Sequence, residues 1–300
     1  MTYLLQRLFI GYASLVILEA VVSCKAIHQN ATQLKVIGGT EIPEDQRPSV
    51  RKLRIFEREA NGIYSQRSDC TMTFIKPNLA LTAGHCLCKG DRFVYAEKER
   101  WEDFIAKSHV IHPLYRCDNK TPNSFDIGLI WFEDKVNMPT SEIGSGTSNE
   151  STEEMALVGY GKTILKITGK FWLGSRTPVT ESVRPSNRRD GKEFDGKHEG
   201  LVTWRGDRPR DPGFIKISAI YDVKTPIAEP MTEVASAEGD SGGPAFSLYR
   251  NQIIGIISRG GMSFTGIGSD KVQVVTELVD LRRNEIQDFL RIHGIETMPP

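Results

Sequence analysis

The 300-residue sequence predicts an all-β protein that ends in an α-helix. Short apolar runs separated by turn residues extend from Val50 to Trp131 and resume at Met155, a spacing typical of all-β domains. Between the two regions, residues 134–154 are rich in Ser, Thr, Gly and Glu, as linkers are. The tail at 276–293 carries apolar residues at helical spacing, and Gly294 can end that helix. We therefore interpret the chain as two β-rich regions joined by a linker and followed by a helix.

The composition is that of an ordinary globular protein. Lys and Arg number 38, as do Asp and Glu, so the charge gives no reason to expect a nucleic-acid partner. A stretch of mixed charge at 184–213 is typical of a solvated surface loop. The body of the chain has no uncharged apolar run of 18 residues, so no membrane span is predicted there. No cofactor is expected.

The first 24 residues have the pattern of a secretory signal peptide. Arg7 precedes an apolar run, and the small residues Ser23, Cys24 and Ala26 offer a cleavage site after about residue 24 or 26. An uncleaved membrane anchor and a bacterial lipoprotein box ending at Cys24 are the alternatives. A signal peptide predicts a secreted, extracellular protein with no stable membrane association after its removal.

In a secreted protein the cysteines are expected to form disulfides, because disulfides persist in an oxidising compartment. Cys24 leaves with the signal, and an even number of cysteines remains, namely Cys70, Cys86, Cys88 and Cys117. Their spacing lacks a second close pair or flanking histidines, so we expect no metal site. Three glycosylation sequons, which only a eukaryotic secretory route would use, begin at Asn30, Asn119 and Asn149.

Residues 239–244, Gly-Asp-Ser-Gly-Gly-Pro, have the clearest chemical use. The hydroxyl of Ser241 is a poor nucleophile at neutral pH, so acyl transfer needs a base beside it and backbone N–H donors facing the oxyanion. The glycines allow the backbone to adopt that shape. Taken alone, the motif is equally consistent with a glycine-rich hairpin that carries a surface serine.

Two further motifs favour the catalytic interpretation. His85 lies in Leu-Thr-Ala-Gly-His-Cys at 81–86, at the end of a predicted strand, and Asp126 precedes an apolar run at 127–130. The chain order His, Asp, Ser resembles that of the chymotrypsin/trypsin-like serine endopeptidases and differs from that of subtilisin or the α/β-hydrolases. The resemblance extends from Val36 to the C-terminus.

The resemblance implies two six-stranded antiparallel β-barrels, with a C-terminal helix packed on the second. The first barrel would span about 36–135, the linker about 136–154, and the second barrel with its helix about 155–300. In such a protein Ser241 is the nucleophile, His85 the general base and Asp126 the group that orients the imidazole. The N–H groups of Gly239 and Ser241 would form the oxyanion hole.

An activation site is also implied by the resemblance. In this family, cutting before a start such as Val36-Ile37-Gly38-Gly39 frees an ammonium that pairs with the aspartate preceding the nucleophile, here Asp240. A buried carboxylate needs such a counter-charge. The chain would therefore carry an activation propeptide at 25–35, and an activating protease would cut between Lys35 and Val36. The alternative is a strand followed by a glycine turn.

The family's disulfides and substrate pocket can be carried over in the same way. Cys70 and Cys86 resemble the pair that bridges the histidine loop, which leaves Cys88 to pair with Cys117. The pocket for the substrate residue preceding the cut is implied to contain Ala235, Ser258, Gly260 and Asp270.

Ala235 stands where trypsin-like members have an aspartate. Counting twelve residues on from Ser258 reaches Asp270 at a pocket-lining position, so we expect Asp270 to supply a negative charge and a preference for Lys or Arg. The alternative is that Asp270 lies in a surface turn and that the pocket is neutral and apolar.

The sequence also departs from the family. Arg259 replaces the usual Trp, and Ala237 and Phe264 replace a cysteine pair. These departures leave a second class of function open, a protease-like secreted binding or regulatory protein without activity. The favoured prediction is a secreted serine endopeptidase made as a zymogen. Its partners would be protein or peptide substrates, an activating protease and protein inhibitors.

Overall fold

The computed structural model describes most of the chain after the predicted propeptide. The described residues are 37, 39–88, 90–97, 102–118, 123–145, 152–172, 175–183, 196–204, 213–225 and 234–299. All described residues belong to one compact unit, 34–300. The predicted signal peptide, the whole of the predicted propeptide and most of the charged stretch at 184–213 lie outside the described residues.

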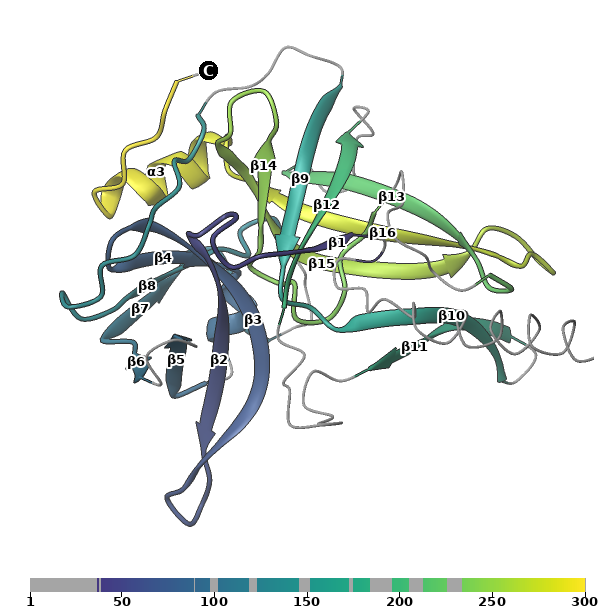
Figure 1. Ribbon diagram of the computed structural model, residues 1–300, viewed down its shortest axis with the longest axis horizontal. Helices are drawn as coiled ribbons and strands as arrows, with labels where there is room; N and C mark the ends of the chain where they lie inside the picture. The colour runs from purple at the N-terminus through teal and green to yellow at the C-terminus, as the bar shows by residue number, and fades with distance from the viewer. Residues whose placement is uncertain are drawn as a thin grey trace, which may run out of the picture. The chain divides into compact units, whose positions relative to one another are not determined.

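The first sheet is antiparallel. Its strands are β2 (Val50–Arg58), β3 (Tyr64–Lys76), β4 (Leu79–Thr82), β5 (Arg92–Glu97), β6 (Glu102–Ile105), β7 (Ser108–Ile111) and β8 (Gly128–Trp131). They lie in the order β6-β5-β2-β3-β4-β8-β7, and this sheet occupies the lower left of Figure 1.

β6 and β7 are the two halves of one bent strand. β6 pairs with β5 at one edge of the sheet, and β7 pairs with β8 at the other. At the bend, the N–H of Ala106 donates to Phe93 O (2.9 Å) and the N–H of Lys107 donates to Trp131 O (2.7 Å). The sheet therefore closes on itself through this corner, and its seven strands are the predicted six with one strand divided.

The second sheet is antiparallel as well. Its strands are β1 (Thr40–Ile42), β9 (Glu153–Gly159), β12 (Lys197–Trp204), β13 (Phe214–Asp222), β14 (Pro244–Ser247), β15 (Ile253–Phe264) and β16 (Lys271–Asp280). They lie in the order β1-β12-β9-β14-β15-β16-β13. The predicted fold of two curled antiparallel sheets is thus confirmed. β1 precedes the first sheet in the sequence, yet it pairs with β12 of the second sheet.

Side-chain alternation explains why the second sheet forms. In β13 the buried residues Ile217, Ala219 and Tyr221 alternate with more exposed polar or apolar ones. In β16, Val272 and Val274 alternate with Lys271 and Gln273 in the same way. Successive strand residues face opposite sides of a sheet, so this pattern buries one face and leaves the other to solvent.

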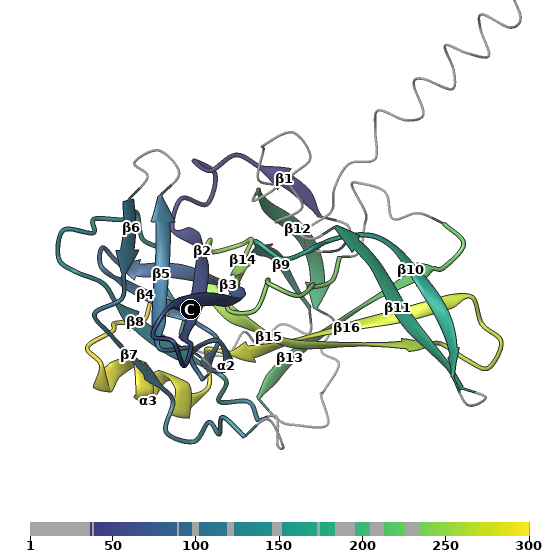
Figure 2. The same cartoon turned by 90° about the horizontal axis from the view of Figure 1, so that it is seen from below.

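Two long hairpins extend from the second half of the chain. β15 and β16 pair from Gly255 opposite Asp280 out to Phe264 opposite Val272. β10 (Thr163–Trp172) and β11 (Ser175–Val183) form a separate two-stranded sheet, and Figure 2 shows it beside the β15–β16 hairpin. Ile167 of β10 packs in one apolar cluster with Val272 and Val274 of β16.

The C-terminal helix α3 (Asn284–Ile292) buries Ile286, Phe289 and Leu290, as its spacing predicts. It begins later than the predicted 276, because residues 276–280 belong to strand β16. Its contacts correct one expectation, because the ring of Phe289 packs against His112 of the first half of the chain. No helix among the described residues is long and apolar enough to span a bilayer.

Candidate active site

His85 is held by Asp126 at two points. The buried strand β4 leads into the short helix α2 (Gly84–Leu87), which carries His85. The backbone N–H of His85 donates to Asp126 Oδ1 (2.7 Å), and His85 Nδ1 lies 2.7 Å from Asp126 Oδ2. Because the carboxylate can only accept, the proton of a neutral imidazole sits on Nδ1 and leaves Nε2 as the acceptor. Nε2 is the atom a general base needs.

Asp126 is buried and surrounded by donors. Its side chain is 5% exposed, and Ser258 Oγ donates to Oδ2 at 2.6 Å. A Cβ on Gly84 would lie 3.1 Å from Oδ1, so a glycine there allows the carboxylate to approach the backbone. Burial and the neighbouring carboxylate of Asp126 raise the pKa of Tyr115 above its usual range. The carboxylate is thus fixed in position and aimed at His85.

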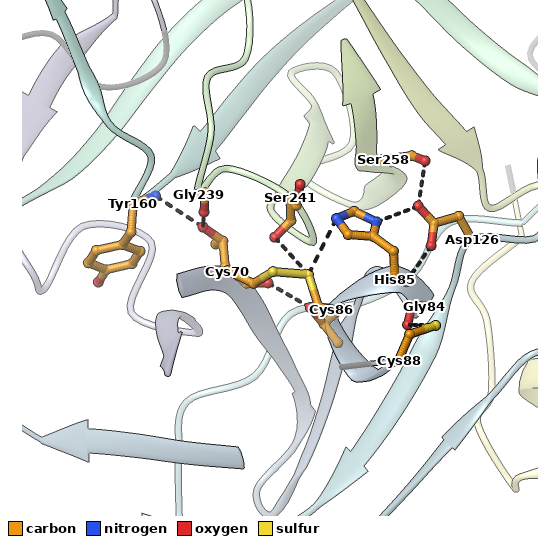
Figure 3. The surroundings of a disulfide bond; sticks show 12 residues. Cys70, Gly84, His85, Cys86, Cys88, Asp126, Tyr160, Gly239, Ser241 and Ser258 are labelled. Atoms are coloured by element: carbon orange, nitrogen blue, oxygen red, sulfur yellow. Dashed lines mark hydrogen bonds and ion pairs between the residues drawn. A yellow bond between two sulfur atoms is a disulfide. The ribbon is translucent and has the colours of Figure 1, made fainter. Parts of the chain in front are cut away.

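Ser241 lies in a tight loop between β13 and β14. Gly239 (φ +100°) and Gly242 (φ +84°) have backbone angles that favour glycine, and a Cβ on Gly242 would clash with Thr82 and the backbone of Thr71. Figure 3 shows His85 between Asp126 on one side and Ser241 on the other. The structure therefore brings together the three residues that the motifs singled out.

Asp240, the residue before Ser241, is fully buried. Its carboxylate accepts the N–H of Gly161 (2.7 Å) and the N–H of Ala237 (2.8 Å). A Cβ on Gly159 or Gly161 would clash with this carboxylate, so both glycines make room for it. Lys35 and Val36, the residues of the predicted cut, lie outside the described residues.

A cleft of about 640 Å³ runs past these residues. Both halves of the chain contribute to it. Its lining consists of Glu57, Arg67, Ser68, Asp69, Cys70, His85, Cys86, Tyr115, Asn123, Asp126, Glu238, Gly239, Ser241, Ser258 and Arg259. A segment of peptide could therefore lie across Ser241 in contact with both sheets.

The cleft includes residues that sequence reasoning did not find. Tyr115 and Asn123 come from the loop before Asp126, and Glu57 and Arg67 come from the β2–β3 hairpin. No motif marks them, because their role depends on loops and strands that meet only in three dimensions. Arg259 lies over the ring of Phe214 at 4.5 Å and pairs with Glu277, so the altered residue at the cleft entrance is a fixed guanidinium.

The predicted substrate pocket is only partly brought together. Ser258 lines the cleft, but Ala235 is buried in an apolar cluster with Ile37. Gly260 lies just beyond Arg259 on β15, where an added Cβ would meet Val275 O at 2.8 Å.

The prediction for Asp270 is wrong. Gly260 pairs with Thr276 of β16. Asp270 lies six residues before Thr276 in the sequence, which places it about 20 Å further along the hairpin. Asp270 lies in the turn that follows Phe264, and its carboxylate pairs with Lys224. The count of twelve residues failed because β15 and β16 extend past the cleft before they turn. The structure thus favours the alternative, in which Asp270 belongs to a surface turn.

The structure contains two disulfides, Cys70–Cys86 and Cys88–Cys117, the pairs that the resemblance implied. His85 with Cys70 and Cys86 is the one group within the described residues that could surround a metal ion. Both sulfurs are in the disulfide, so they are not the thiolates that metals bind. The sequon residues Asn30, Asn119 and Asn149 lie outside the described residues.

Ala237 and Phe264, which replace a cysteine pair of the family, both pack against the apolar cluster that contains Val272 and Ala235. Apolar contact with this cluster therefore stands where a covalent bond would otherwise hold the loop before Ser241.

The fold and the arrangement of His85, Asp126 and Ser241 define a double-barrel protein of the serine-protease type. The family model described as Trypsin matches residues 36–187, which is just over half of the chain, and the chain belongs to the trypsin family. The match includes His85 and Asp126 and ends before Ser241.

Among solved structures, the chain is similar in fold to one titled HL collagenase. The identity is 16% and the TM-score 0.52, and the alignment covers 87% of this chain and 100% of the other. At this identity the likeness supports the fold alone. No curated protein matches the sequence.

Proposed function

We propose that this protein is a secreted serine endopeptidase that hydrolyses peptide bonds through an acyl-enzyme on Ser241. The observation that carries the proposal is the pair of contacts between His85 and Asp126, which fixes the imidazole with Nε2 as the acceptor. Ser241 lines the same cleft. Membership of the trypsin family supports a peptide substrate.

Each catalytic group has a defined task in this proposal. Ser241 Oγ attacks the substrate carbonyl while His85 Nε2 takes its proton, and His85 then gives that proton to the leaving amine. A water molecule then attacks the acyl-enzyme while His85 takes its proton, and His85 returns that proton to Ser241 Oγ as the acid product leaves. Asp126 stabilises the imidazolium that forms between the two steps. The N–H groups of Gly239 and Ser241 stabilise the negative oxygen, a contribution of about 3–4 kcal/mol per donor in measured cases.

The proposal includes synthesis as a zymogen that an extracellular protease activates between Lys35 and Val36. Ile37, the residue after the predicted new N-terminus, supports this. Its carbonyl accepts the N–H of Ala235 (3.1 Å) and the hydroxyl of Tyr221 (3.1 Å), so the chain is anchored close to the loop that contains Asp240. N-terminal sequencing of active protein is expected to begin at Val36. Activity in protein with an uncut Lys35–Val36 bond would rule out this step.

A covalent probe tests the central claim without knowledge of the substrate. A fluorophosphonate is expected to label Ser241 in the cleaved protein, and Ser241→Ala or His85→Ala should abolish labelling and peptide hydrolysis. Ser68→Ala is the matched control, because Ser68 lines the same cleft but lies outside the three motifs. Folded, cleaved wild-type protein that resists the probe would instead support a protease-like binding or regulatory protein without activity.

A further inference from the structure

Thr71 is a residue of the first sheet that touches the nucleophile loop of the second half. It follows Cys70 on β3, pairs with Lys52 of β2 and is fully buried. The sequence gives no sign of a special role, because a buried threonine in a strand is common. Its contacts set it apart.

Thr71 makes two hydrogen bonds to backbone carbonyls on either side of Asp240. Its N–H donates to Ser241 O (2.8 Å), and its hydroxyl donates to Gly239 O (3.0 Å). The N–H of Tyr160 donates to the same hydroxyl at 3.0 Å. An amide N–H can only donate, so the hydroxyl accepts from Tyr160 and its single proton goes to Gly239 O. Figure 3 shows Tyr160 and Gly239 close together beside Ser241.

The importance of these two hydrogen bonds follows from the other hydrogen bonds of the loop. Three peptide groups run from Gly239 to Gly242. In the first, Gly239 O is held by Thr71 and the N–H of Asp240 donates to Ala237 O (3.1 Å). In the second, Asp240 O accepts the N–H of Gly243 (2.8 Å).

In the third peptide group, Ser241 O is held by Thr71 and the N–H of Gly242 donates to Ile257 O (2.7 Å). Thus five of the six polar groups on these peptides have a hydrogen-bond partner among the described residues. The sixth is the N–H of Ser241, the donor that the proposed reaction needs at the oxyanion. Thr71 supplies two of the five bonds.

The hydroxyl of Thr71 restrains the most adaptable part of the loop. Gly239 has φ +100°, and glycine has several backbone conformations of similar energy, so its carbonyl could rotate at little cost. A rotated carbonyl would turn the peptide that links Gly239 to Asp240. This peptide joins the two neighbouring peptides that carry the proposed oxyanion donors, so its rotation changes the angle between those two N–H groups. A donor that is misaligned contributes little, because hydrogen bonds weaken steeply with angle.

We propose that Thr71 is a positioning residue for catalysis, whose hydroxyl fixes the oxyanion-binding conformation of Gly239–Ser241 from the opposite sheet. The inference rests on the proposed function, since it assigns a task within that reaction. It predicts a loss in the chemical step, with substrate binding little changed.

Two substitutions separate the hydroxyl from the rest of the side chain. Thr71→Val keeps the branched shape and removes the donor, whereas Thr71→Ser keeps the donor. Thr73→Val is the matched control, because Thr73 lies two residues along the same strand, is equally buried, and its hydroxyl has no hydrogen-bond partner within the described residues. Thr71→Ala serves in place of the valine variant if valine prevents folding.

The readouts are the second-order rate of fluorophosphonate labelling and, for a peptide substrate found by library screening, kcat and KM. Thr71→Val removes the hydrogen bonds to Gly239 O and from Tyr160 N–H. It is expected to lower the labelling rate and kcat about 10- to 100-fold, the loss expected when the buried Gly239 carbonyl is left without its donor, with KM unchanged. Thr71→Ser should restore most of the rate, and Thr73→Val should match wild type. Urea unfolding confirms that each variant is folded under the assay conditions.

The outcomes distinguish this inference from the proposed function. A wild-type protein that is folded, cleaved and unlabelled contradicts both. A reactive wild type with an equally reactive Thr71→Val contradicts the inference alone. A Thr71→Val variant that loses only stability, or that loses activity in equal measure with Thr73→Val, shows that Thr71 acts through packing and also overturns it.

Discussion

Lys197 offers a test of buried charge in this fold. The side chain on β12 is fully buried, and its Nζ donates to Glu44 O (2.9 Å) and Arg47 O (3.0 Å), with the Glu44 carboxylate 3.7 Å away. Burial, the largest influence, lowers the pKa of Lys197 from 10.5 to about 8 against the attraction of Glu44. The ammonium therefore carries a free-energy penalty in the folded state that it does not carry in the unfolded chain.

The sign of the pH dependence follows from where each state binds the proton. Between pH 8 and 10.5 the unfolded chain holds the Lys197 proton more tightly than the folded protein does, so stability rises with pH in this window. The stabilisation is complete above the unfolded pKa and is lost as the pH falls through the folded pKa. With about 1.4 kcal/mol per pKa unit, the gain between pH 7.5 and 9.5 is about 2 kcal/mol.

Lys197→Met isolates this contribution, because all other titrating groups are common to both proteins. Urea unfolding at pH 7.5, 8.5 and 9.5 gives the free energy of unfolding of each. The stability of wild type minus that of Lys197→Met is expected to rise by about 2 kcal/mol over this range. A difference that stays constant or falls with pH would refute the assignment of a lowered pKa to Lys197.

Three further changes test the structure. Replacing both Cys88 and Cys117 by Ser should lower the free energy of unfolding by about 3–4 kcal/mol, the chain-entropy value for a separation of 29 residues, and a loss under about 1 kcal/mol would contradict it. His112 Nδ1 accepts the N–H of Leu114 (3.2 Å), and burial lowers the pKa of His112, with Arg283 and Glu285 as its charged neighbours. The stability that neutral His112 contributes is complete above the unfolded pKa of 6.5 and is lost as the pH falls through the folded pKa. Urea unfolding should therefore show that the free energy of unfolding falls more between pH 7 and 5 in wild type than in His112→Gln. The Arg282 side chain is 6% exposed and contacts Asp280 (2.8 Å) and Glu153 (2.7 Å), so Arg282→Met should cost about 3 kcal/mol or more, and adding Glu153→Gln should recover part of that loss in urea unfolding.

Local chemistry explains why the sequence offers candidates for the central site residues. A serine nucleophile needs glycines around it, a base and an acid, and each requirement leaves a short motif at His85, Asp126 or Ser241. The all-β class could be predicted for a similar reason, because strand alternation and turn residues are visible within windows of a few residues. Both kinds of signal depend only on neighbours in the chain.

Register could not be predicted in this way. Asp270 was placed by counting from Ser258, but the β15–β16 ladder shifts between Ile257 and Arg259 and continues to Phe264 before it turns. A hairpin of any length satisfies the same alternation, so the sequence does not say where the turn lies relative to the cleft. Hence the motif residues could be predicted while the pocket beside them could not.

Contacts between the two sheets could not be predicted from the sequence either. The apolar spacing of α3 shows that Phe289 is buried, yet not that it packs on His112, since any apolar surface would meet the requirement. The hydroxyl of Thr71 reaches Gly239 across 168 positions of sequence, and only the folding of both sheets brings the two together. The residues of the proposed triad are specified by what the proposed reaction needs, whereas Thr71 is specified by which carbonyl of the opposite sheet lies beside it. A residue of the second kind could differ between proteins with the same triad, so the oxyanion loop of this chain must be tested by substitution at Thr71 itself.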